Sequence, residues 1–143
     1  MTLRSWILAG VLSTVAMGQA PTPAGPETLV RGLLAAFNAH DVPKMLTFVS
    51  ADIRWLTVEG EKVTAEAAGA SQLEQSMTRY FRSVPTAHSE LKQLVVSGPF
   101  VSAVEEAQWQ AAGESRRQCS LSVYEIREQK VKAVWYFPAH RCD

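Results

Sequence analysis

The stretch SLSVYEIREQKVKAVWYF, residues 120–137, decides the fold of this chain. Two runs rich in β-branched and aromatic residues flank Glu128-Gln129, a pattern typical of a β-hairpin with a two-residue turn. In that register Ser122 lies opposite Trp135, with Tyr124 on the same face. Both faces of the hairpin are then largely apolar, and an apolar outer face is uncommon on a monomer. The sequence therefore predicts a homodimer that forms through the sheet.

Working outward from this hairpin, the preceding segments also read as strands. Turn residues separate them at Gly98-Pro99 and Gly113-Glu114, and such short turns join antiparallel neighbours. A two-residue turn at Gly113-Glu114 places Glu105 opposite Ser122, on the face of Tyr124 and Trp135. A register slip of one residue would instead bring Glu106 to that face. The expected strands are 91–97, 101–111, 116–126 and 131–137.

Helical spacing dominates the first half of the chain. Apolar residues recur at helical intervals from Leu29 to Phe37, so a helix of about three turns is expected there. Asp41 can cap a second short helix. The run 53–58 reads as a strand, with 62–67 as its partner. Ser71 and Glu74 form a capping-box pattern before a third helix, which Pro85 ends.

The order of these elements resembles the cone-shaped nuclear transport factor 2-like fold, and four segments resemble its SnoaL-like branch. The resemblance implies an α+β domain in which a curved antiparallel sheet wraps around three N-terminal helices and forms a conical, largely apolar pocket. Family members include ketosteroid isomerases, polyketide cyclases, epoxide hydrolases and scaffold proteins, so the fold alone assigns no chemistry. The segments are AFNAHD at 36–41, FVSADIRW at 48–55, VYEIR at 123–127 and VKAVWYF at 131–137.

The isomerase branch can be tested residue by residue. Alignment of Asn38 to Asp41 with the matching isomerase segment puts Leu33 in the place of the oxyanion-hole tyrosine and Thr57 in the place of the aspartate base. Leucine donates no hydrogen bond, and a threonine hydroxyl is a poor base. Steroid isomerisation by that mechanism is therefore not expected, and no convincing pair of aspartates supports the epoxide hydrolase mechanism.

The first 18 residues have the pattern of a secretory signal peptide. Arg4 precedes an apolar stretch at 6–16 that is too short to span a bilayer, and small residues at 16 and 18 suit a signal peptidase. Cleavage after Gly18 leaves a linker at 19–26, a domain at 27–138 and a tail at 139–143. The mature protein is expected in the periplasm or outside the cell, without a membrane association.

Composition excludes further classes of function. The chain of 143 residues carries 14 basic and 14 acidic side chains, and 13 and 14 remain after cleavage. A nucleic-acid-binding protein would show a basic surface, so nucleic acid is not an expected partner. The apolar fraction of 47 % is enough to bury a core and argues against intrinsic disorder.

Glu105 is the main candidate for chemistry. A carboxyl group buried in an apolar pocket beside Ser122 and Tyr124 can act as a general acid or base. His88 opens a strand and is a second catalytic candidate at the pocket mouth, although a lone histidine there is more often a surface residue. The candidates for binding a ligand are Trp55, Tyr80, Trp109, Ser122, Tyr124 and Trp135, with Tyr80 also readable as ordinary core.

Metal and cofactor sites are not expected. His40, His88 and His140 lie far apart in sequence and form no metal-binding pattern. Cys119 and Cys142 are the only cysteines, and export would allow a disulfide between them. The hairpin register leaves Cys142 four residues past the partner of Cys119, so the tail would have to curl back, and the pairing stays open.

Three functions remain after these exclusions. The first is binding of a small, mainly apolar or aromatic molecule in the cone, without established catalysis. The second is a SnoaL-like isomerase, cyclase or hydrolase that uses Glu105, with His88 or Tyr124 as a helper. The third is a non-enzymatic, dimeric interaction protein whose cone is filled by its own side chains.

Overall fold

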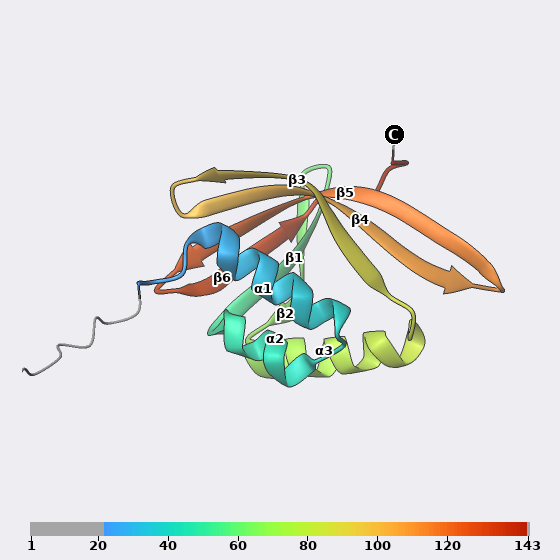
Figure 1. Cartoon of the computed structure of the whole chain (residues 1–143), viewed down its shortest axis with the longest axis horizontal. Helices are drawn as coiled ribbons and strands as arrows, with labels where there is room; N and C mark the ends of the chain where they lie inside the picture. Colours follow the sequence, from blue (N-terminus) through green and yellow to red (C-terminus); the bar gives the residue numbers. More distant parts are fainter. Residues whose placement is uncertain (1–21, 143) are drawn as a thin grey trace, which may run out of the picture.

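A computed structural model describes residues 22–142 of the chain, in which three helices and six strands follow one another (Figure 1). The predicted signal peptide lies outside these residues. None of the described helices is long and apolar enough to cross a membrane. The elements are α1 (Pro26–Asn38), α2 (Val42–Phe48), β1 (Val49–Glu59), β2 (Lys62–Ala68), α3 (Ala70–Ser83), β3 (His88–Ser97), β4 (Phe100–Ala111), β5 (Glu114–Arg127) and β6 (Lys130–Tyr136).

All six strands belong to one curved sheet in the order β2-β1-β6-β5-β4-β3. Neighbouring strands are antiparallel except β1 and β6, which run parallel. The sheet arches over the three helices, which all lie on its concave side (Figure 1). This arrangement confirms the predicted α+β cone and adds one parallel pair to a sheet that was expected to be antiparallel throughout.

The two predicted helix caps had different outcomes. Asp41 caps α2 as expected, because its side chain accepts a hydrogen bond from the backbone N–H of Lys44 at 2.9 Å. The capping box at Ser71 was wrong, since α3 already begins at Ala70 and its N-cap is Gly69. The backbone N–H of Gly69 donates to the carbonyl of Ile53 at 2.7 Å, and its φ of 97° suits glycine alone. The chain therefore turns into the helix directly from β2.

The register of β4 against β5 differs from the prediction by two residues. Glu105 lies opposite Ser120 rather than Ser122, because Ala112 and Gly113 form the turn with φ values of 51° and 77°. Two consecutive positive φ angles are the mark of a tight hairpin turn that matches strand twist. A shift of two residues keeps every side chain on its face. Glu105 and Tyr124 therefore still share the concave face.

The register of β5 against β6 differs by one residue, which has a larger consequence. The turn at Glu128-Gln129 forms as predicted, but an irregularity follows between Glu125 and Ile126. Beyond it, Ser122 lies opposite Tyr136, and Trp135 lies opposite Val123 on the outer face. The predicted pairing of Ser122 with Trp135 was wrong, because a single extra residue exchanges the two faces of the strand.

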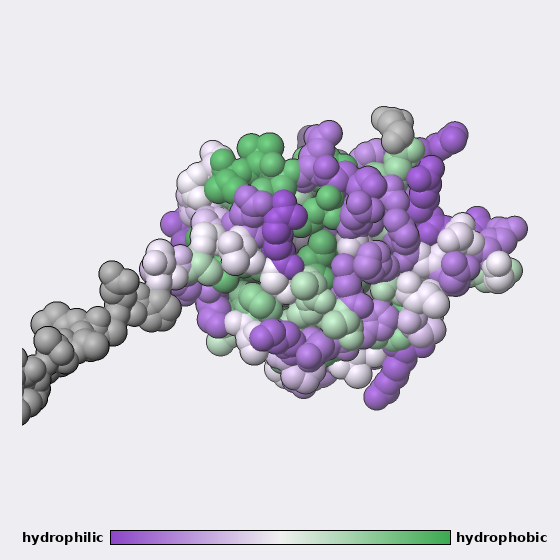
Figure 2. All heavy atoms as spheres, viewed as in Figure 1, coloured by the Kyte–Doolittle hydropathy of each residue, from purple (hydrophilic) through white to green (hydrophobic). Residues whose placement is uncertain are grey.

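The main core lies between the helices and the concave face of the sheet. Leu29, Val30 and Leu33 from α1 pack there against buried residues of the sheet, among them Val101 and Val134. The convex face keeps apolar groups in solvent, including Val95, Phe100 and Leu121. Figure 2 shows hydrophobic residues gathered over the β3–β4 hairpin.

The C-terminal tail continues alongside β5 after β6 ends. Cys119 and His140 exchange two backbone hydrogen bonds of 2.9 and 2.8 Å, which brings the tail alongside the strand. Cys119 and Cys142 then form a disulfide, with Cα atoms 5.1 Å apart. The pairing that the sequence left open forms without a curl of the tail, because Cys119 lies opposite His140 and Cys142 is two residues past this partner rather than four.

Candidate functional site

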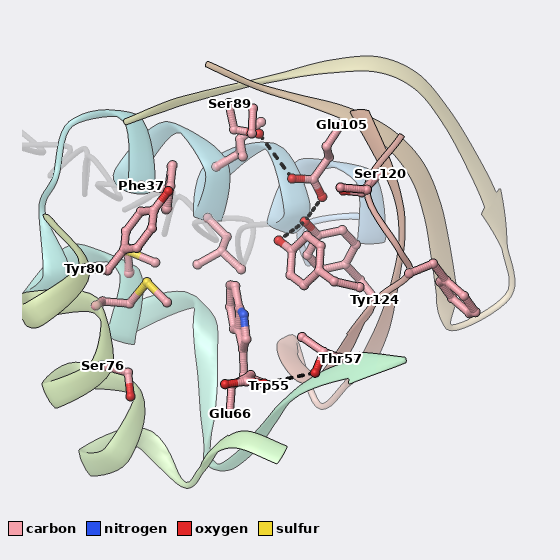
Figure 3. Close-up of a pocket in the computed structure, with 18 of the residues that line it drawn as sticks. Phe37, Trp55, Thr57, Glu66, Ser76, Tyr80, Ser89, Glu105, Ser120 and Tyr124 are labelled. Carbon is pink, nitrogen blue, oxygen red and sulfur yellow. Dashed lines mark hydrogen bonds between the residues drawn. The ribbon is translucent and has the colours of Figure 1, made fainter. Parts of the chain in front are cut away.

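A cavity of about 480 Å³ lies between α1, α3 and the concave face of the sheet (Figure 3). This volume falls within the range of roughly 300–1,000 Å³ that small-molecule sites occupy. Most of the lining is apolar or aromatic. The lining residues are Leu33, Leu34, Phe37, Met45, Trp55, Thr57, Glu66, Ser76, Met77, Tyr80, Ser89, Glu105, Ala107, Gln118, Ser120, Tyr124, Tyr136, Phe137 and Ala139.

Glu105 projects from β4 into one end of this cavity and is only 5 % exposed. One carboxylate oxygen, Oε1, accepts hydrogen bonds from Ser122 Oγ and Tyr124 OH. The other, Oε2, accepts one from Ser89 Oγ at 3.2 Å. The Tyr136 hydroxyl lies 3.1 Å from that of Tyr124 and donates to it, since the Tyr124 hydroxyl already directs its hydrogen at Glu105.

The two tyrosines of this cluster are held in their neutral form. Burial raises the pKa of Tyr124 well above its ordinary value, and the negative charge of Glu105 raises it further. Burial and the same carboxylate also raise the pKa of Tyr136. Both phenols therefore remain hydrogen-bond donors throughout the neutral pH range.

Aromatic rings form the walls that lead away from Glu105. The rings of Trp55 and Tyr136 have centroids 5.5 Å apart, and those of Phe37 and Tyr80 have centroids 6.0 Å apart. Figure 3 shows Trp55 between the Glu105 cluster and the far end of the cavity. There Thr57 Oγ1 donates to Glu66 Oε1 at 2.9 Å. The site is thus an apolar chamber with one polar group of residues at each end.

Residues 30–134 match the SnoaL-like domain family. The chain belongs to the SnoaL-like domain family. A comparison with curated proteins gave no match.

Solved structures share the fold of this SnoaL-like domain at low sequence identity. A proposed SnoaL-like polyketide cyclase from Shewanella denitrificans is 11 % identical, with a TM-score of 0.69, 80 % of this chain covered and 90 % of that one. TerC co-crystallised with polyporic acid is 12 % identical, with a TM-score of 0.66 and coverages of 78 % and 88 %. A hypothetical protein of ketosteroid isomerase-like fold from Catenulispora acidiphila, in complex with trimethylamine, is 12 % identical, with a TM-score of 0.66 and coverages of 77 % and 84 %.

Five of the eight predicted site residues of this SnoaL-like domain line or support the cavity. The structure joins Glu105, Ser122 and Tyr124 by hydrogen bonds, with Ser122 fully buried beneath the carboxylate rather than in the cavity wall. Trp55 and Tyr80 line the cavity.

The other three predicted residues lie elsewhere. His88 is exposed and alternates with Ser89, so it points to the opposite face of β3. Trp109 shares the face of Glu105 but pairs with Arg116, in the part of the β4–β5 hairpin that extends past the helices (Figure 1). Trp135 lies on the outer face because of the irregularity in β5 and β6. None of the three is among the lining residues.

Sequence reasoning missed Tyr136 and Ser89. Tyr136 takes the place that was predicted for Trp135. No residue pattern in this part of the sequence indicates the irregularity that exchanges the two side chains. Ser89 is fixed by Asn38, whose Nδ2 donates to the Ser89 carbonyl and whose Oδ1 accepts from the Ser89 backbone N–H, both at 2.8 Å. These contacts span 51 residues of sequence, so only the tertiary structure brings them together.

The described residues include one cluster that resembles a metal site. Side chains of Glu106, Cys119 and Cys142 lie close together on the outer face. The two cysteines are bonded to each other, so they offer no thiolate to a metal ion. A second, smaller cavity adjoins this cluster on the outer face.

Proposed function

We propose that this SnoaL-like domain is an exported protein that binds a small, mainly apolar molecule in the cavity beneath its sheet. The observation that carries the proposal is a chamber of about 480 Å³ with aromatic walls and one buried cluster of hydrogen-bonded polar groups around Glu105. Apolar lining with a few convergent polar groups is the usual composition of a small-molecule site.

Relatives of the same fold support a binding role without defining the ligand. One was solved with trimethylamine, an amine, and another with polyporic acid, an acid. The fold therefore accommodates small molecules of different character. The class of ligand for this chain has to be inferred from its own lining residues.

Export is supported by the predicted signal peptide and by the disulfide. A bond between Cys119 and Cys142 is typical of proteins that fold in an oxidising compartment. Export to the periplasm or the extracellular space would provide that environment. The mature chain would then begin at Gln19.

Mass spectrometry of protein recovered from its native compartment tests this proposal. Under native conditions the spectrum should show the mass of a chain that begins at Gln19 plus one small organic molecule, which is released on denaturation. A chain of full length would contradict export. A cavity without any bound molecule would contradict the binding role and favour a pure interaction protein.

A second candidate function is catalysis by Glu105 as a general base. The observation that favours it is the position of Ser120, which lies opposite Glu105 in the sheet and also lines the cavity (Figure 3). Its hydroxyl could donate a hydrogen bond to negative charge that forms on a substrate when Glu105 removes a proton. If the released molecule is a substrate, the wild-type protein should convert it to a product of different mass or, in D₂O, introduce deuterium into it. The Glu105→Gln variant should do neither. An unaltered molecule in both proteins excludes this candidate.

We also propose that the convex face of the sheet pairs two copies of the chain. Leu121 is 39 % exposed at the centre of this face, on β5. Leu121→Lys should weaken the dimer by about tenfold or more, because a charge would be buried between two apolar surfaces. The matched control is Val96→Lys, which changes an apolar residue of similar exposure, 44 %, on the concave side of β3. Light scattering across a concentration series decides, and a wild-type monomer at all concentrations would contradict the proposal.

A further inference from the structure

The cavity walls carry negative charge without a compensating cation. Glu105 and Glu66 are both lining residues, and the lining set contains no lysine, arginine or histidine. Among residues 22–142, no ion pair involves either carboxylate. The cavity therefore has a negative potential, which is strongest at the end where Glu105 is removed from solvent.

The next residue along the chain shows how this protein neutralises a buried carboxylate on its other face. Glu106 is also only 5 % exposed, on the outer side of β4. Lys92 Nζ lies 3.8 Å from its carboxylate and Arg117 Nη1 lies 4.0 Å from it. Two cations thus accompany Glu106, whereas hydroxyl groups alone surround Glu105. Hydroxyls stabilise a carboxylate but do not cancel its charge, and a buried charge without an opposite partner is unfavourable.

The hydrogen bonds of Glu105 leave room for one more donor. Oε1 already accepts from two hydroxyls, while Oε2 accepts only from Ser89. A carboxylate oxygen has two lone pairs, so Oε2 keeps one acceptor position. Figure 3 shows this oxygen at the edge of the open chamber, between Ser89 and the aromatic walls.

The walls beside this open position suit a cation with apolar substituents. Trp55, Tyr136 and Tyr80 present aromatic rings to the cavity. The faces of aromatic rings attract organic cations, tryptophan most strongly, and their apolar area also packs against hydrocarbon. A neutral molecule would gain only the second of these contributions.

From these observations we infer that the ligand is a protonated organic amine, with its N–H directed at Glu105 Oε2 and its apolar substituents held between the aromatic rings. This inference rests on the proposed function, because it names the chemical class of the molecule that the cavity binds. The amine supplies the positive charge that the protein supplies for Glu106 but not for Glu105.

Calorimetric titration of the mature protein with three probes of similar size tests the inference. The probes are benzylamine, benzyl alcohol and benzoate, which at neutral pH are cationic, neutral and anionic. The amine should bind about ten- to hundredfold more tightly than the alcohol, because a hydrogen bond to a charged group is strong when buried. Benzoate should not bind. Equal or tighter binding of the alcohol or of benzoate would overturn the inference.

Substitution of single carboxylates then locates the effect. Glu105→Gln should reduce the affinity for the amine to that for the alcohol and leave the alcohol unchanged. Glu106→Gln is the matched control, since it makes the same change one residue away on the outer face, and it should alter neither affinity. An unchanged preference for the amine in a folded Glu105→Gln protein would overturn the assignment to Oε2. The wild-type comparison of the three probes stands even if a variant does not fold.

The outcomes also separate this inference from the proposed function. Binding of the alcohol without a preference for the amine refutes only the cationic ligand. Failure of all three probes to bind, together with an empty cavity in native mass spectrometry, refutes both. Binding of the amine alone supports both.

Discussion

The Cys142→Ser variant should be about 3 kcal/mol less stable toward unfolding than the wild-type protein. The disulfide joins residues 23 positions apart, and opening it restores the conformational freedom of that loop to the unfolded chain. The backbone pairing of Cys119 with His140 would also lose its covalent support. Urea denaturation at neutral pH measures the difference.

A control substitution in the same tail distinguishes the effect of losing the disulfide from the effect of changing a tail residue. Arg141→Ser alters an exposed neighbour of Cys142 and keeps the disulfide, so it should change the free energy of unfolding by no more than about 0.5 kcal/mol. The wild-type protein under reducing conditions should behave like Cys142→Ser. A Cys142→Ser protein as stable as wild type would show that the bond constrains little of the unfolded chain.

The sequence predicted the fold because its strongest signals are local and agree with one another. The apolar period of α1, the cap at Asp41 and the turn at Glu128-Gln129 each specify their own element. The cap of α3 could not be predicted in the same way. Gly69 is held by a hydrogen bond to Ile53, on a strand that precedes it by 16 residues, and this contact displaced the capping box at Ser71.

The sequence predicted those parts of the candidate site that depend only on which face of a strand a side chain occupies. Glu105 and Tyr124 reach the cavity although the predicted register was wrong by two residues, since an even shift preserves the face. Trp135 does not, because an odd shift exchanges faces, and Tyr136 takes its place. Glu106 has two cations nearby and Glu105 has none, and this difference depends on residues of neighbouring strands. It could therefore not be predicted from the sequence.

High pH should destabilise the protein through Tyr124 and Tyr136. Both have a pKa raised above the ordinary value of about 10, first by burial and then by the charge of Glu105. Above pH about 10 the unfolded chain loses these protons while the folded protein keeps them, so the unfolded state binds fewer protons and stability falls as pH rises. Each phenol contributes a slope of about 1.4 kcal/mol per pH unit in that window, and neither contributes below pH about 9.

Urea denaturation at a series of alkaline pH values, with tyrosinate absorbance recorded alongside, checks this slope. Tyr124→Phe combined with Tyr136→Phe should flatten the decline above pH about 10, although the double variant starts from a lower stability because Glu105 loses a donor. Tyr80→Phe is the control. Burial also raises the pKa of Tyr80, but its ring is partly exposed, so removal of its hydroxyl should change the slope less. An identical decline in the wild-type protein and the double variant would mean that groups outside the Glu105 cluster govern alkaline unfolding.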